Sequence, residues 1–135
     1  MKFLLSLLIA FGAAATAATA PTLPSLNAFF SLASMEAQCR VTGYPAEASL
    51  EAYRQHTIAY YQAGAPGTTL AKPDIDGALQ ALAGPVPASY LERSSEAAKK
   101  SSAAQLKMAC QNMGRMLDTQ ISIEKLTLME LNAGK

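Results

Sequence analysis

His56, the only histidine of the chain, is the side chain best suited to acid–base chemistry, because an imidazole gains and loses a proton near neutral pH. On a helix, Tyr53, His56 and Tyr60 occupy positions i, i+3 and i+7 and therefore share one face. A general base also needs a carboxylate or carbonyl that orients its ring. Glu51 and Asp74 are candidate orienters, but no spacing ties either of them to His56. We therefore predict that the protein is not an enzyme, and an enzymatic site around His56 remains an alternative.

Sulfur-bearing side chains gather near the C-terminus, at Met108, Cys110, Met113 and Met116. Thioethers and thiolates are soft ligands that favour copper(I). Methionines on an apolar helix also fill gaps in a core, and Cys110 has a second cysteine to pair with. The chain has neither a Gly-x-Ser-x-Gly motif nor a phosphate-cradling glycine motif. We expect no metal site and no cofactor.

The two cysteines, Cys39 and Cys110, predict one disulfide, because an even cysteine count in an exported chain favours pairing. Each cysteine lies on an apolar helical stripe, so the bond would join the end of the first helix to the last helix. Chain-entropy models assign such a long loop a stabilisation of about 4 kcal/mol.

An export signal is predicted over residues 1–17. Lys2 gives it a positive start, residues 3–11 (FLLSLLIAF) form an apolar run, and small residues follow, with cleavage expected between positions 15 and 20. The apolar run is shorter than the roughly 20 residues that a membrane-spanning helix needs. We therefore expect a periplasmic or extracellular protein, a single domain over 18–135, without stable membrane insertion after signal removal.

The composition of the remaining chain predicts an all-α fold. Alanine, the best helix former, is abundant. Strand-favouring valine and isoleucine are scarce, and neither an alternating strand pattern nor a hairpin turn signal occurs. Proline and glycine divide the chain into predicted helices over 25–41, 45–63, 74–83 and 89–131.

The last predicted helix is long and is either continuous or broken near Ser101-Ser102. We expect a small bundle of three to four helices. The second half of this stretch carries a series of residues spaced three or four apart, in which Glu124 is the one charged member. Gly114 lies inside this stretch, where glycine destabilises a helix relative to alanine. We expect a close approach of another helix at Gly114 to compensate for this loss.

The function expected from these observations is that of a protein-binding module. The chain carries 11 basic and 10 acidic residues, a net charge of +1 that argues against a nucleic-acid partner. An exported inhibitor, an immunity-type protein or a periplasmic adaptor would fit a small neutral domain without a catalytic motif. The candidate contact surface is the exposed side of the last helix together with Tyr53, His56, Tyr60 and Tyr61, because tyrosine is enriched at interfaces.

A carrier of a small apolar ligand is the other alternative. Its pocket would lie between the first helix and the last one, because bundles host such pockets and methionines adapt to their contents. The residues expected to line it are Phe29, Phe30, Leu32, Met113, Met116 and Leu117.

Overall fold

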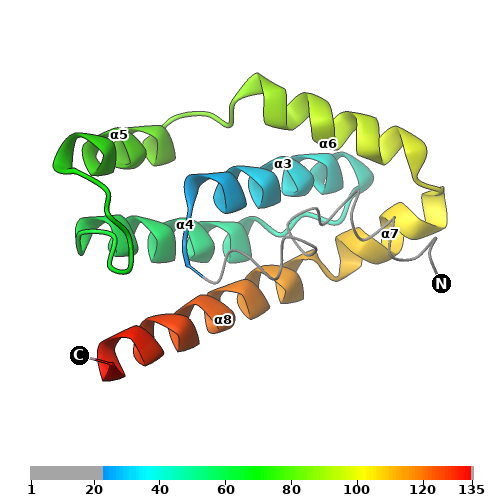
Figure 1. Cartoon of the computed structure of the whole chain (residues 1–135). Helices are drawn as coiled ribbons and strands as arrows, with labels where there is room; N and C mark the ends of the chain where they lie inside the picture. The colour runs from blue at the N-terminus through cyan, green and yellow to red at the C-terminus, as the bar shows by residue number, and fades with distance from the viewer. Residues whose placement is uncertain (1–22, 135) are drawn as a thin grey trace.

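The computed structural model describes residues 23–134, and the predicted export signal lies outside the described residues. The described part contains six helices and no strand, which confirms the all-α prediction. Figure 1 shows the helices in their spatial order. In chain order they are α3 (Leu26–Thr42), α4 (Glu47–Gln62), α5 (Lys72–Ala83), α6 (Ala88–Lys100), α7 (Ala103–Gln111) and α8 (Met113–Ala133).

Helices α3 and α4 form an antiparallel pair (Figure 1), and local chemistry defines both ends of α3. The hydroxyl of Ser25 accepts a hydrogen bond from the backbone N–H of Ala28 at 3.0 Å. At the other end, Gly43 adopts a left-handed conformation with φ of 89°, and its N–H donates back to the carbonyl of Arg40. The short connection over residues 43–46 then returns the chain along α3.

The C-terminal stretch is divided twice. Of the two alternatives for this stretch, the structure has the break near Ser101-Ser102: the Ser102 hydroxyl accepts from the N–H of Gln105, whose side chain accepts from the N–H of Ser102. A second break, at Asn112, was not predicted. There the side-chain amide of Asn112 donates to the carbonyl of Met108 at 3.0 Å. The described residues therefore form more helices than the three to four expected, because the 89–131 stretch gives three.

The bundle is arranged around α3, which packs against α6 on one side and α4 on the other, while α8 lies along α4 (Figure 1). The core is filled by large buried side chains from several helices, among them Phe29, Tyr53, Leu82, Met113 and Leu117. A β-carbon at Gly114 would lie 3.3 Å from the hydroxyl oxygen of Ser49, so α4 and α8 approach closely there, as predicted.

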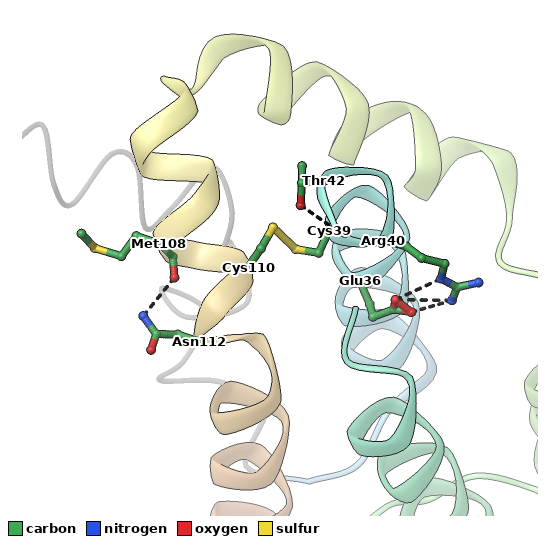
Figure 2. Close-up of a disulfide and its surroundings, with 7 residues drawn as sticks. All are labelled: Glu36, Cys39, Arg40, Thr42, Met108, Cys110 and Asn112. Atoms are coloured by element: carbon green, nitrogen blue, oxygen red, sulfur yellow. Dashed lines mark hydrogen bonds and ion pairs between the residues drawn. A yellow bond between two sulfur atoms is a disulfide. The ribbon is translucent and has the colours of Figure 1, made fainter. Parts of the chain in front are cut away.

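The predicted disulfide is also confirmed. Cys39 of α3 and Cys110 of α7 are bonded, with their α-carbons 5.2 Å apart (Figure 2). The bond fixes the end of the central helix to the short segment between the two breaks. Beside it, the buried carboxylate of Glu36 pairs with the half-exposed guanidinium of Arg40 at 2.5 Å (Figure 2).

Candidate functional site

His56 lies on the side of α4 that faces α8, and its side chain is only 10% exposed. Its Nε2 atom lies 2.9 Å from Oε1 of Glu124, a residue of α8 that is completely buried. A carboxylate at this distance orients the ring. In the neutral imidazole it also places the proton on Nε2, since a carboxylate only accepts. The orienting residue is therefore Glu124.

Glu124 accepts hydrogen bonds from three side chains. The hydroxyl of Tyr53 donates to Oε2 at 2.8 Å, and the side-chain amide of Gln120 donates to the same oxygen at 2.7 Å. The third donor is His56, at Oε1. A buried carboxylate is costly unless it is hydrogen-bonded in this way, and no buried side-chain nitrogen or oxygen of residues 23–134 lacks a partner. We call Tyr53, His56, Gln120 and Glu124 the Glu124 cluster.

Tyr53 holds the cluster against the core. Its ring is fully buried, stacks on His56 with centroids 6.1 Å apart, and lies 6.0 Å from the ring of Phe29. Burial, and next the negative charge of Glu124, raise the pKa of the Tyr53 phenol far above its usual range. The phenol therefore remains a neutral donor to Glu124 over the whole physiological pH range.

The other nitrogen of His56, Nδ1, makes no hydrogen bond with a described residue. In the neutral ring with Nε2 protonated, Nδ1 carries a lone pair that is able to accept a proton. The arrangement therefore contains an oriented base. In residues 23–134, no group of three or more histidine, cysteine, aspartate or glutamate side chains has the arrangement of a metal site.

The tyrosines considered as interface residues face inward. Tyr53, Tyr60 and Tyr61 are all buried, and the hydroxyl of Tyr60 donates to the carbonyl of Pro66 at 2.7 Å. Their phenol rings belong to the core cluster and leave little surface for a partner. The exposed part of the candidate contact surface therefore lies on the last helix.

Glu124 is the residue that sequence reasoning missed. The two candidate orienters lie elsewhere: Glu51 pairs with Arg54 at 3.3 Å, and Asp74 is exposed in the first turn of α5. The signal was present, because Glu124 is the charged exception in the apolar series of the last helix. Its neighbours in this series face the core. A charged residue between them is buried as well, and it then needs a polar partner on the facing helix.

The opposite side of α8 exposes apolar side chains. Ile123, Leu126 and Met129 are 41%, 60% and 66% exposed, and they follow one another at intervals of three residues. We call these three residues the α8 stripe. Its exposed polar neighbours on the helix are Thr119, Ser122, Lys125 and Glu130. No helix in residues 23–134 is both long and apolar enough to cross a bilayer.

The sulfur-bearing residues do not converge. Met108 is 66% exposed and points away from the bundle (Figure 2), whereas Met113 is fully buried. Cys110 is engaged in the disulfide. These thioethers lie on different sides of α7 and α8, and the buried one fills the core.

Two of the surface cavities formed by described residues lie away from the Glu124 cluster. One, of about 430 Å³, lies between the start of α4 and the α7–α8 junction, where Tyr44, Ser49, Cys110 and Gly114 contribute to its lining. The other, of about 580 Å³, is bordered by α6 side chains alone. The residues expected to line a carrier pocket, such as Phe29 and Leu117, line neither of them and are packed in the core.

Comparison of the chain with protein-family models, with curated proteins and with solved structures finds no match.

Proposed function

We propose that the protein is an exported, non-enzymatic binding module that contacts another protein through the α8 stripe. The observation that carries the proposal is the exposure of Ile123, Leu126 and Met129 along one line of a helix whose opposite side is anchored in the core. Single exposed apolar residues are ordinary, but aligned ones are typical of an interaction site. The export signal predicted over residues 1–17 and the Cys39–Cys110 bond support an oxidising compartment.

The partner that suits this surface presents an apolar groove. A helix with anchors at intervals of three or four residues binds by laying its apolar line into such a groove. Three side chains alone bury less than the roughly 800 Å² per partner of a standard interface. The partner surface must therefore also cover the polar neighbours of the stripe, which are Thr119, Ser122, Lys125 and Glu130. The charges of Lys125 and Glu130 cancel, which suits a partner without strong net charge.

Site-specific photo-cross-linking in the exported fraction tests this proposal. A photoreactive amino acid is placed at Leu126 in one variant and at Lys99 in the control variant. Lys99 is exposed on α6, and this helix lies on the other side of α3 from α8 (Figure 1). We expect one defined cross-linked product with the probe at 126 and none at 99. Equal products at both positions, or none at 126, would contradict the proposal.

The hydrogen bond between Glu124 and His56 favours a second function, proton abstraction by Nδ1 of His56. A base of this kind would activate a water or hydroxyl group that attacks a small ester. Hydrolysis of a chromogenic acetate ester by the purified chain tests this function. We expect His56→Ala to remove the protein-dependent rate, and Glu124→Gln to lower it while the imidazole remains. A rate unchanged in His56→Ala would eliminate this candidate.

A further inference from the structure

Four of the methionines in residues 23–134 form two groups with opposite accessibility, and the fifth, Met116, is partly buried. Met108 and Met129 are each 66% exposed, whereas Met35 and Met113 are buried at 4% and 0%. An exposed thioether meets dissolved oxidants directly, and a buried one is shielded by packing. Oxidation would therefore select Met108 and Met129 over the core methionines.

The two exposed methionines differ in their surroundings. Met129 is the C-terminal member of the α8 stripe, one turn after Leu126. Met108 lies on α7, beyond the bend at Asn112, and does not belong to the stripe. Neither side chain is needed to fill the core, so a chemical change at either one leaves the packing of the bundle intact.

We propose that Met129 is an oxidation site whose conversion to the sulfoxide switches off docking at the α8 stripe. This inference rests on the proposed function of the stripe. In the chemical step, the thioether sulfur attacks hydrogen peroxide and the O–O bond breaks. One oxygen forms the S–O bond of the sulfoxide, and the other leaves as water. The sulfur is oxidised by two electrons and the peroxide is reduced, so the peroxide is the only co-reactant needed.

The effect on docking follows from the polarity of the product. A sulfoxide oxygen accepts hydrogen bonds, and an apolar groove offers no donor to replace the water that it loses. An unsatisfied buried polar group costs enough to weaken binding about tenfold or more. Since Met129 faces away from the core, the melting temperature of the chain should not change.

Peroxide treatment of the folded chain, followed by peptide mass spectrometry, is the first part of the test. We expect sulfoxide at Met108 and Met129 well before Met35 or Met113. Oxidation of the buried pair at the same rate as Met129 would overturn the inference. This readout needs no partner, so it stands apart from the proposed function.

The second part compares Met129→Leu with the matched control Met108→Leu. After peroxide, we expect Met129→Leu to retain its cross-linking at position 126, and Met108→Leu to lose it as the wild type does. Retention on a phenyl column gives a readout without a partner. After peroxide it should fall in Met108→Leu, in which Met129 is the remaining methionine among the exposed large apolar residues of 23–134. Unchanged retention with fully oxidised Met129 would overturn the switch. A different outcome would overturn the proposed function instead: untreated protein gives no cross-link at position 126, although peroxide lowers retention on the phenyl column.

Discussion

An ordinary amphipathic helix buries apolar side chains and exposes charged ones. Part of α8 departs from this pattern, because its inner side buries a charge and its outer side exposes apolar side chains. On the inner side, the charged Glu124 is completely buried, while its neighbour Ile123 is 41% exposed on the outer side. In α7, the inward Cys110 is 3% exposed and the outward Met108 is 66% exposed. The comparison teaches that a facing partner, rather than hydrophobicity alone, determines which residues are buried here.

The inner side tolerates a charge because α4 supplies the compensating donors. Tyr53 and His56 belong to α4, and together with Gln120 they occupy both carboxylate oxygens. The outer side has no facing helix within the described residues, so its apolar groups remain in water. The inner side is thus built for stability and the outer side is available for recognition.

Removal of the disulfide is the largest change on the inner side. We expect the double variant Cys39→Ser and Cys110→Ser to lose about 4 kcal/mol of unfolding free energy, because the unfolded chain regains the entropy of a long loop. Denaturant titration under non-reducing conditions measures this loss, and reduced wild type should match the variant. A loss below about 1 kcal/mol would show that the bond is not a major restraint on α7.

Glu124→Ala tests the buried cluster. We expect a loss of about 3 kcal/mol, because three donors, including those of Tyr53 and His56, lose their acceptor in the interior. Glu130→Ala, an exposed glutamate on the same helix, is the matched control and should change stability by less than about 0.5 kcal/mol. Similar losses in both variants would remove the distinction between the two sides.

Alkaline pH should weaken the inner side selectively. Burial is the main cause that raises the pKa values of Tyr53, Tyr60 and Tyr61. The stability that these neutral phenols contribute is complete below about pH 10, where unfolded tyrosine titrates, and is lost as the pH rises above it. Each tyrosine adds at most about 1.4 kcal/mol per pH unit to the decline. Unfolding free energies between pH 9 and 11 measure it, and a slope no smaller in Tyr53→Phe than in wild type would refute the role of Tyr53.

The smallest effect is expected on the outer side. Leu126→Ser should leave the unfolding free energy within about 0.5 kcal/mol of the wild type, because the side chain is 60% exposed and loses little packing. The same denaturant titration measures it. A loss as large as that of Glu124→Ala would mean that the α8 stripe is part of the folding core.

Much of the fold was predictable from local chemistry. Helices begin or end at Ser25, Gly43 and Ser102 because of the hydrogen bonds and backbone preferences of these residues. A chain with two cysteines allows one intramolecular disulfide, so its pairing followed from the sequence. The bend at Asn112 was not predictable, because its effect depends on how α7 and α8 are held by α3 and α4. A lone asparagine inside a helical pattern has no distinctive local signal.

The candidate site was predictable only in part. His56 and Tyr53 were identified from their shared face, but their partner Glu124 is 68 residues away from His56 along the chain. No spacing rule links two helices at that separation. The outward orientation of Leu126 and Met129 equally depends on which side of α8 packs on α4, so the apolar series alone did not assign them to the surface.

The affinity of Leu126→Asp for the cross-linked partner, compared with that of Val41→Asp, tests the central claim most directly. Val41 is 87% exposed and lies at the end of α3, so its substitution repeats the chemical change away from the α8 stripe. We predict that Leu126→Asp weakens binding at least about tenfold, as expected when a charge enters an apolar groove, while Val41→Asp binds like the wild type. Equal affinities in the two variants would contradict recognition through the α8 stripe.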